Sequence, residues 1–373
     1  MNFNKNLYNH ITYSLSDNDM KMVQSVPPGG NWRNIPLSIP SKRLERIRET
    51  GGRTTLYGRM LWDKPSYTIT TYFNRPGNGT YIHPEENRLI SAREAARIQT
   101  FPDGFEFKGS KSSYLKQIGN AVPPIFARQL ACKIKSTFPK LSTVVDLFAG
   151  CGGMTVGFKQ EGFRSVLAND VEKHYIATFK HNFQDTKTIV GDIRESNIQE
   201  SILDLDKVDI LIGGPPCQGF SLAGKQNKDD VRNFLFRDYF SIIEGLKPKI
   251  FIMENVPGIL TMNNGAFLEK IQTLSTRLGY KLEINKIFTT NYSVPQKRKR
   301  VIIIGKKTEK TLFPKPSITS EANFLTVRDA ISDLPSLNNS RGEEFMKVLN
   351  YKYNSDLQKY LGGMLSYKKF LTL

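Results

Sequence analysis

Cys217 is the residue with the clearest capacity for chemistry in this sequence. It follows two glycines and two prolines in LIGGPPCQGFS (residues 211–221), at the end of an apolar run that is typical of a buried strand. This turn holds the thiol out of the core with little freedom to move, and a nucleophile needs fixed geometry, access and a lowered pKa. A buried structural cysteine is the alternative, but apolar residues do not surround this turn. We therefore predict that Cys217 is a nucleophile.

An acid and two arginines follow in the segments MENVPG and VPQKRKRVIIIG. Glu254 ends a mostly apolar run, so burial should raise its pKa and let it hold or donate a proton near neutral pH. Asn255 could orient Glu254 or a substrate. Gln296, Arg298 and Arg300 alternate on entry to a strand, which would put both arginines on one face. Such arginines could bind a phosphate or the polar edge of a base, although a cationic run is usually a solvated surface.

A glycine-rich turn and three acidic residues indicate a nucleoside ligand. The turn lies in DLFAGCGGMTVGF, and its glycines let the backbone approach a ligand ahead of a helix. It lacks GxGxxG spacing and is a weak signal alone. Asp170 ends the next predicted strand, where an acid can bind ribose hydroxyls, and Asp192 ends the third, where it could accept from an adenine amino group. Any one of these would be an ordinary loop aspartate. The full set is Asp146, Gly150, Gly152, Gly153, Asp170 and Asp192.

Six β-branched runs between residues 143 and 307 must position these groups. They are TVVDLFAG, RSVLAND, TIVGDI, VDILIGG, KIFIMENV and RVIIIGK, and amphipathic stretches separate several of them. This alternation predicts an α/β fold with a doubly wound, mostly parallel sheet, whose ligands bind at the carboxyl ends of the strands. The flanking regions are irregular and rich in turn residues, which predicts a second, smaller domain.

Composition narrows the class of partner. The chain has 53 Lys and Arg against 35 Asp and Glu, a net charge of +18, so a polyanion such as nucleic acid is the first candidate partner. A merely basic soluble surface is the alternative. Three cysteines without CxxC spacing and four scattered histidines indicate neither a disulfide framework nor a metal site. We find neither a secretory signal nor an apolar run near the ~20 residues of a membrane span, and we expect a cytoplasmic protein.

The motifs DLFAGCGG, GGPPCQGFS, ENVPG and QKRKR, with GNAVPP elsewhere, together resemble the signature motifs of the C5-cytosine-specific DNA methyltransferases. The resemblance covers nearly the entire chain, and its specific part is the cysteine motif with ENV. It implies a Rossmann-like S-adenosylmethionine-dependent methyltransferase sheet and an irregular target-recognition domain. The implied enzyme is a DNA (cytosine-5)-methyltransferase that methylates C5 of a flipped cytosine in a specific duplex sequence. Bacterial origin and restriction–modification, with a separate cognate endonuclease, are also implied.

The resemblance assigns roles to matching residues. Cys217 would attack C6 of cytosine, which activates C5, and Glu254 would bind N3 and stabilise the adduct. Arg300 would contact the base oxygen, and Arg298 would assist near the cysteine. The base must first be rotated out of the duplex. The expected cofactor-binding residues are Asp146, Phe148, Gly150, Gly152, Gly153, Asp170, Val171, Asp192, Ile193, Pro216, Leu235 and Asn120. The expected substrate and DNA contacts are Gln218, Ser221, Asn255, Gln296, Arg33 and Arg59. Val171 stands where many members have an aromatic residue.

The order of the segments departs from that of most family members. The segments RLISAREAARIQTFPDGF and QIGNAVPP, which usually come last, here lie at residues 88–124, ahead of the cofactor loop. We interpret this as a circular permutation with its break inside the target-recognition domain. The expected parts are residues 1–87 (second part of the recognition domain), 88–140 (permuted segment on the catalytic domain), 141–310 (catalytic domain) and 311–373 (first part of the recognition domain).

This interpretation requires the two ends of the chain to pack in one small domain, near residues 1–15 and 361–373. Termini often lie close together, and breaks in irregular loops leave core contacts unchanged. The rival interpretation is a fused leading fragment with a frayed tail. Basic residues of the leading part, among Trp32 and Tyr57, would hold DNA phosphates. They are Arg33, Arg43, Arg46, Arg48, Arg53, Arg59 and Lys64.

Three other functions remain as alternatives. An RNA (tRNA) cytosine-5 methyltransferase would use the same chemistry, but the sizeable extra domain favours duplex DNA. A catalytically inactive nucleic-acid-binding protein should lack the nucleophile, the acid or the cofactor loop, and all three are present. A nicotinamide dehydrogenase is disfavoured by Cys217 and by the missing GxGxxG. We expect a monomer that binds duplex DNA.

Overall fold

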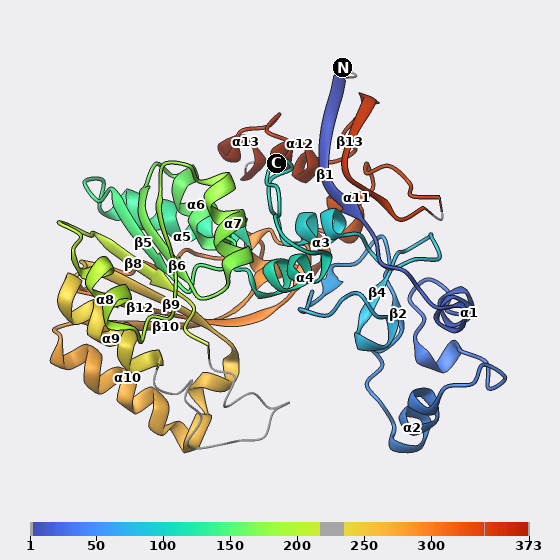
Figure 1. Cartoon of the computed structure of the whole chain (residues 1–373), viewed down its shortest axis with the longest axis horizontal. Helices are drawn as coiled ribbons and strands as arrows, with labels where there is room; N and C mark the ends of the chain where they lie inside the picture. The colour runs from blue at the N-terminus through green and yellow to red at the C-terminus, as the bar shows by residue number, and fades with distance from the viewer. Residues whose placement is uncertain (1–2, 217–234, 339, 372–373) are drawn as a thin grey trace. The chain divides into compact units, whose positions relative to one another are not determined.

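The computed structural model describes residues 3–216, 235–338 and 340–371 (Figure 1). They form two compact units. The first, here called the terminal unit because it holds both ends of the chain, comprises Met1–Asn120, Ser293–Arg298 and Ser317–Leu373. The second, the sheet unit, comprises Ala121–Tyr292 and Lys299–Pro316. The expected segment 88–140 is therefore divided at Asn120. In the described residues, no helix combines the length and apolar character that crossing a membrane requires.

A seven-stranded sheet forms the sheet unit, in the order β10-β12-β9-β8-β5-β6-β7. Neighbours from β9 to β7 pair in parallel, and β12 is antiparallel to both β9 and β10. The predicted doubly wound, mostly parallel α/β fold is confirmed, because each of the six predicted runs contains a strand. The strands are β5 (Thr143–Leu147), β6 (Arg164–Asp170), β7 (Lys187–Val190), β8 (Ile210–Gly213), β9 (Ile250–Asn255), β10 (Lys281–Phe288) and β12 (Lys299–Lys306).

Helices cover both faces of this sheet (Figure 1). One group is α5 (Pro124–Thr137), α6 (Gly153–Gln160) and α7 (Lys173–Asn182), and the other is α8 (Ser196–Leu203), α9 (Leu235–Leu246) and α10 (Ala266–Arg277). α9 buries Phe236, Tyr239, Phe240 and Ile243, the helical spacing of an apolar stripe. At Gly157, α6 approaches α5 so closely that a Cβ would lie 2.3 Å from the backbone nitrogen of Arg128. The strand order reverses between β5 and β8, the place where such sheets bind ligands.

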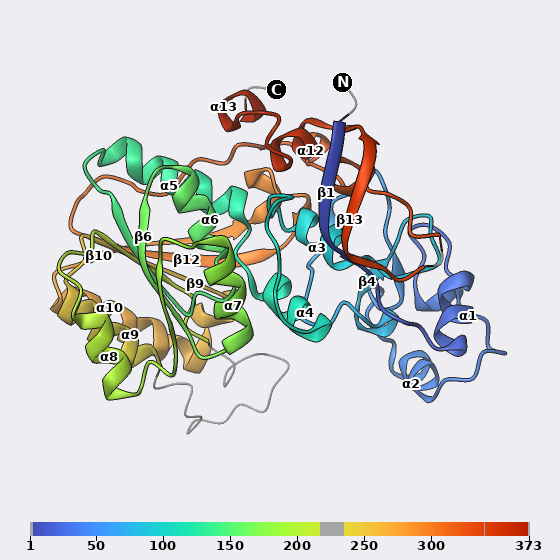
Figure 2. The same ribbon diagram turned by 45° about the horizontal axis from the view of Figure 1, so that its top comes forward.

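The terminal unit is built from short elements. One of its two-stranded sheets pairs β1 (Phe3–Ile11) with β13 (Gly342–Tyr351) in antiparallel fashion, and the backbone N–H of Asp103 donates to the carbonyl of Leu361. Segments from the start and the end of the chain therefore lie side by side (Figure 2). The other strands are β2 (Gly58–Arg59), β3 (Ser66–Tyr67), β4 (Thr80–Ile82) and β11 (Gln296–Lys297). The helices are α1 (Asp17–Ser25), α2 (Lys42–Thr50), α3 (Ala92–Ile98), α4 (Lys111–Asn120), α11 (Val327–Ile331), α12 (Asp356–Leu361) and α13 (Tyr367–Leu371).

Buried charges join the early and late parts of this unit. The Arg97 guanidinium, which is fully buried, donates to Asp103 at 2.6 Å, to Asp333 at 2.5 Å and to the hydroxyl of Tyr351 at 2.9 Å. Lys5 of β1 also pairs with Asp103. Burial alone would raise the pKa of Asp103, but Arg97 and Lys5 outweigh it and hold that pKa below its ordinary value. Removing one member would leave a buried charge unpaired, which is strongly destabilising.

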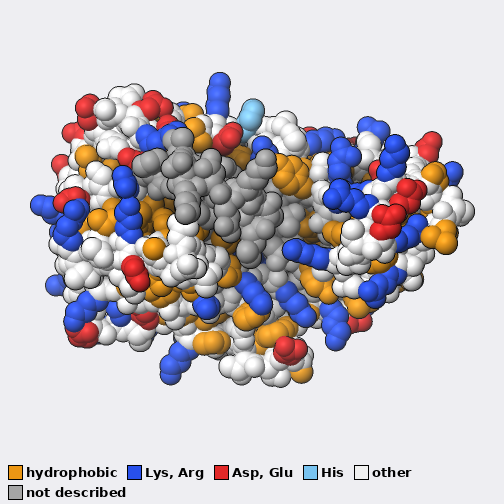
Figure 3. All heavy atoms as spheres, turned by 90° about the horizontal axis from the view of Figure 1, so that it is seen from below, with side chains coloured by type: hydrophobic (Ala, Val, Ile, Leu, Met, Phe, Trp, Pro, Cys, Tyr) orange, Lys and Arg blue, Asp and Glu red, His pale blue; other side chains and the backbone are white. Residues whose placement is uncertain are grey.

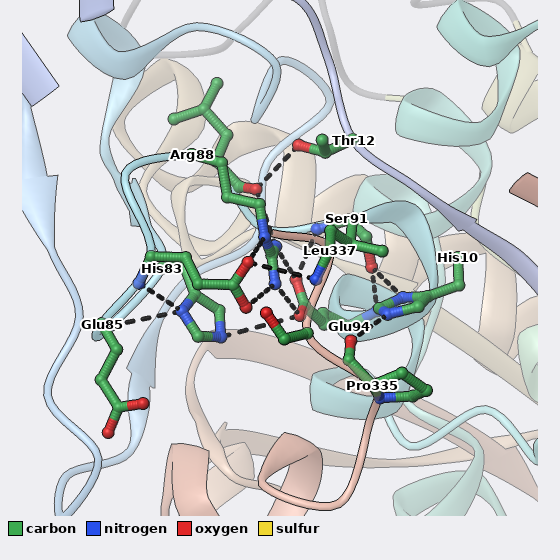
Figure 4. Close-up of polar contacts among 12 residues, drawn as sticks. His10, Thr12, His83, Glu85, Arg88, Ser91, Glu94, Pro335 and Leu337 are labelled. Atoms are coloured by element: carbon green, nitrogen blue, oxygen red, sulfur yellow. Dashed lines mark hydrogen bonds and ion pairs between the residues drawn. The ribbon is translucent and has the colours of Figure 1, made fainter. Parts of the chain in front are cut away.

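A second buried polar cluster contains two histidines (Figure 4). Nε2 of His10 lies 2.9 Å from the carbonyl oxygen of Pro335, which can only accept, so Nε2 carries a proton, and Nδ1 lies 2.9 Å from the Ser91 hydroxyl. Nδ1 of His83 accepts from the backbone N–H groups of Glu85 and Glu86. The His83 ring, whose Nδ1 accepts hydrogen bonds, is therefore bound in its neutral form. Burial lowers the pKa of both His10 and His83.

We predict that acid destabilises the terminal unit through these histidines. Their pKa is 6.5 in the unfolded chain and lower in the folded one, so the unfolded state binds more protons as the pH falls. The contribution to stability is complete above pH 6.5 and is lost as the pH falls through the folded pKa, at about 1.4 kcal/mol per histidine for each unit of pKa difference. Thermal unfolding measured between pH 8 and 5 should show a shallower pH slope for His10→Gln. A His174→Gln control, changing an exposed histidine, should keep the original slope. Identical slopes for all three proteins would contradict this prediction.

Candidate active site

Ten of the predicted site residues lie at the carboxyl edge of the parallel strands. β7, β6, β5, β8 and β9 are successive neighbours in the sheet, so the loops that follow them share one edge. Predicted residues at this edge are Phe148, Gly150, Gly152, Gly153, Asp170, Val171, Asp192, Pro216, Glu254 and Asn255, and Leu235 begins α9. Cys217, Gln218 and Ser221 lie outside the described residues.

The loop after β5 has an unusual backbone that glycine makes possible. Gly150 and Gly152 have φ values of +57° and +94°, in the left-handed region. At Gly152 a Cβ would also lie only 2.5 Å from the ring of Phe183, whereas at Gly150 it would meet nothing within 4 Å. The loop is therefore packed on one side and open at Gly150, and α6 begins directly after it at Gly153. A loop of this shape at a helix N-terminus can bring backbone N–H groups to a ligand.

Two acidic side chains extend this edge. Asp170, at the end of β6, accepts the N–H of Gly150 at 2.8 Å and that of Glu172 at 2.9 Å, so it fixes the loop after β5. Burial raises the pKa of Asp170. Asp192 is partly exposed after β7, and the hydrogen bond from Arg194 lowers its pKa. Val171 is 60% exposed beside Asp170. The edge thus offers an open apolar side chain flanked by carboxylates.

Two predicted cofactor contacts do not reach this open edge. Asp146 is buried beneath the loop, where its carboxylate accepts the hydroxyl of Thr155 at 2.6 Å, and burial raises the pKa of Asp146 to about 7. The side chain of Ile193 packs into the hydrophobic core. Asp146 therefore holds the first turn of α6 against β5 in this structure, and a contact between its carboxylate and the cofactor stays a prediction. Thr155 was missed, and no spacing signal marks it.

Glu254 lies at the end of β9, where an ion pair with Arg300 positions its carboxylate. Its Oε1 lies 2.7 Å from Nε of Arg300, which β12 brings alongside because Val301 pairs with Asn255. A Cβ on Gly214 would lie 3.5 Å from its Oε2. Asn255 donates from Nδ2 to the carbonyl of Pro215 at 2.9 Å. The carboxylate therefore lies between a guanidinium and the Gly-Pro-Pro segment that leads to Cys217, not in the wholly apolar surroundings that its strand suggested.

Comparison with known proteins decides the family. The model of the C-5 cytosine-specific DNA methylase family matches residues 2–136 and 142–364. The chain belongs to this methylase family. Among its relatives, the Type II methyltransferase M1.HphI of Haemophilus parahaemolyticus is 38% identical over 216 residues, 56% of this chain and 56% of that protein. The Type II methyltransferase M.DdeI of Desulfomicrobium norvegicum is 35% identical over 226 residues, 58% of this chain and 54% of that protein.

One solved structure resembles this chain over part of its length. It is a prophage-encoded protein of E. coli assigned as a DNA modification methyltransferase, which is 30% identical with a TM-score of 0.44. The match covers 52% of this chain and 55% of that one. The chain likewise spans about half the length of the curated relatives named above.

Two predicted contacts near the end of β11 are buried within the terminal unit. Gln296 accepts the N–H of Ile69 and donates to Gln99, both at 2.9 Å. Arg298 is 1% exposed and donates to the carbonyl of Ile69 at 3.2 Å. The prediction that Arg298 and Arg300 share one strand face was wrong, because β12 begins only at Lys299 and the chain changes unit there. Gln296 and Arg298 support the backbone at Ile69.

The terminal unit also corrects one predicted DNA contact. Arg59 is 4% exposed, and its guanidinium donates to the carbonyls of Val23, Val26, His83 and Glu86 and to the side chain of Asn87. It was wrong as a DNA contact because all of its donors serve the unit itself. Arg33 is exposed, with its guanidinium 5.4 Å from the ring of Trp32. Asn120, a predicted cofactor contact, is the exposed last residue of α4 in the terminal unit.

Proposed function

We propose that this chain is a DNA (cytosine-5)-methyltransferase that methylates a flipped cytosine within a specific duplex sequence. The observation that carries the proposal is the position of Glu254, between Arg300 and the segment that leads to Cys217, at the edge that also holds the glycine loop. Membership of the C-5 cytosine-specific DNA methylase family supports it. Because the matched relatives are Type II methyltransferases, we propose that the enzyme protects bacterial DNA in the cytoplasm against a separately acting endonuclease.

The proposed chemistry assigns a role to Cys217, Glu254 and Arg300. C5 of cytosine is a poor nucleophile, so the Cys217 thiolate would add to C6 and turn C5 into a carbon nucleophile. Glu254 would bind N3 and hold a proton there, which stabilises the adduct. Arg300 would keep that carboxyl group in place and contact the base oxygen. S-adenosylmethionine, when bound, supplies the methyl group. Loss of the C5 proton and elimination of the thiolate then restore the aromatic ring.

The residues of the carboxyl edge fit S-adenosylmethionine. The open side of the loop at Gly150 leaves room for the ligand against the backbone, and the exposed Val171 offers an apolar contact for adenine. Asp170 has carboxylate oxygens for ribose hydroxyls, and Asp192 for the adenine amino group. Phe148, Gly152, Gly153, Pro216 and Leu235 would complete the pocket, and Asn120 stays a predicted cofactor contact.

Duplex DNA would be held by the basic surface of the terminal unit. Lys and Arg side chains lie over this unit on the face shown in Figure 3. The exposed basic residues predicted to contact phosphates are Arg33, Arg43, Arg46, Arg53 and Lys64. Arg43 and Arg48 each donate to backbone carbonyls of their own unit, at 2.7 Å in both cases. Binding through several phosphates should weaken steeply with salt.

Methyl transfer to nucleic acids tests the proposal directly. The purified protein should move labelled methyl groups from S-adenosylmethionine to duplex DNA and not to tRNA. Bisulfite sequencing of DNA from expressing cells should then find 5-methylcytosine at one recurring sequence. Labelling of tRNA alone would favour the RNA methyltransferase, and labelling of neither would favour a binding protein without activity.

We also propose that the chain is circularly permuted within the target-recognition domain. Support comes from the pairing of β1 with β13 and from the two blocks of the family match, which leave out residues 137–141 between α5 and β5. A reordered gene that begins at Ser142 and joins residue 373 to residue 1 through a flexible linker should give a folded protein with an unchanged melting temperature. A reordered chain that does not fold would contradict the permutation.

A further inference from the structure

β13 has an open edge. Within the described residues its only strand partner is β1, and Figures 1 and 2 both show β1 on one side of it. The carbonyl of Arg341 accepts the N–H of Thr12 at 2.9 Å, so the backbone groups of the odd-numbered residues of β13 point toward β1. Those of the even-numbered residues therefore point to the open edge. Such an edge is a template for pairing with another strand.

The two faces of β13 differ in character. On the inner face, Met346 and Val348 pack against the core cluster of Leu7, Tyr351 and Tyr353. On the outer face, Phe345 is 50% and Leu349 is 63% exposed. The ring of Phe345 lies on that of Tyr8, with ring centres 5.5 Å apart. Glu343 and Lys347, two residues before and two residues after Phe345, are exposed on the same face of the strand.

We propose that this edge binds β13 of a second copy of the chain, antiparallel, with Phe345 opposite Phe345 of the second copy. Hydrogen bonds across the new edge require even-numbered residues of one copy to face even-numbered residues of the other. The two-fold axis must therefore pass through a residue position, such as 344, 345 or 346, and not midway between two residues. An axis at Phe345 places Glu343 opposite Lys347 of the other copy, twice by symmetry. Opposite charges across a strand pair are stabilising.

Neighbouring registers are less favourable. An axis at Glu344 would place the two Glu344 side chains opposite each other and Arg341 opposite Lys347, which are both like-charge pairs. An axis at Met346 would leave Glu343 opposite Leu349 and Lys347 opposite Phe345. The register centred on Phe345 alone pairs both charges and covers the exposed ring. It also extends a two-stranded ribbon, which is marginal by itself, into a four-stranded sheet.

This dimer departs from the monomer that the sequence led us to expect, and it does not depend on the proposed function. The β13 segment GEEFMKVLNY was not predicted as a strand, so its open edge had no place in the sequence analysis.

The mass of the protein in solution and variants that exchange the charges at residues 343 and 347 test the dimer. Light scattering should give twice the chain mass of 42.4 kDa. Glu343→Lys and Lys347→Glu should each raise the dimer dissociation constant by at least about tenfold, because each opposes like charges. The double variant Glu343→Lys/Lys347→Glu should restore the dimer, and a merely structural role of these residues would not produce that rescue. A mass of 42.4 kDa for the unmodified chain, or no rescue, would overturn the proposal.

Disulfide trapping tests the register. In a Cys132→Ser background, which removes an exposed thiol, the Phe345→Cys chain should form a covalent dimer on mild oxidation, since directly opposed residues lie within disulfide range. Leu349→Cys is the matched control, because Leu349 would lie opposite Arg341 and far from its own copy. Equal cross-linking of both variants would overturn the register.

Discussion

Replacing Cys217 by serine is expected to abolish methylation of duplex DNA while leaving the binding of S-adenosylmethionine nearly unchanged. A hydroxyl is a far weaker nucleophile than a thiolate at neutral pH, so C6 would not be attacked and C5 would stay unreactive. The cofactor would be held by the loop after β5 and by the acids of β6 and β7, none of which the substitution changes. The expected result is therefore a loss of turnover without a loss of cofactor affinity, measured by methyl incorporation and by calorimetry.

Covalent trapping identifies the sulfur itself. Duplex DNA with 5-fluorocytosine at the target position cannot lose a proton from C5, so the adduct should accumulate when S-adenosylmethionine is present. Mass spectrometry of the peptide should place the DNA on residue 217. Cys132→Ser, which removes an exposed cysteine of α5, is the control and should trap DNA as well as the unmodified protein. Methylation that persists in Cys217→Ser, or DNA on another residue, would refute the assignment.

The central strands of the sheet were predictable because they are buried. β5 is buried along its whole length, and most of β9 is buried as well, so both are continuous apolar runs that sequence patterns reveal. β10 was not predicted because it is an edge strand of mostly half-buried side chains. β13 was not predicted because most of its side chains are exposed. Their patterns resemble those of polar loops. Pairing with β12 and with β1 forms these strands, and such partners are distant in the sequence.

The candidate site was predictable where the fold alone places a residue. Residues that end parallel strands, such as Asp170 and Glu254, must lie at the carboxyl edge. The errors concern side chains whose partners are distant in sequence. Arg59 was predicted to contact DNA and Arg298 to assist near Cys217, but the structure buries each guanidinium against backbone carbonyls of the terminal unit. Charge in a sequence does not show whether a guanidinium meets solvent or buried carbonyls.

Replacing Glu254 by glutamine is expected to slow methylation by about 10²–10⁴-fold, the usual contribution of one positioned acid or base. Glutamine fills nearly the same space beside Gly214 and Arg300, and its amide can still form a hydrogen bond with the base. It cannot transfer a proton to N3, however, so the negative charge that builds up on the ring as the thiol adds to C6 would stay unneutralised. Turnover should therefore fall much more than DNA affinity, and single-turnover kinetics with saturating DNA separates the two.

Glu283→Gln is the matched control for this prediction. Glu283, on β10, pairs with Lys306 at 2.9 Å, so this variant also breaks a glutamate ion pair with a basic residue of β12. Lys306 is the last residue of β12, whereas Arg300 is near its start, so the two pairs lie toward opposite edges of the same sheet. Glu283→Gln should lose a comparable amount of stability and keep its turnover. Equal losses of turnover in the two variants would mean that Glu254 acts through the sheet and not through the base.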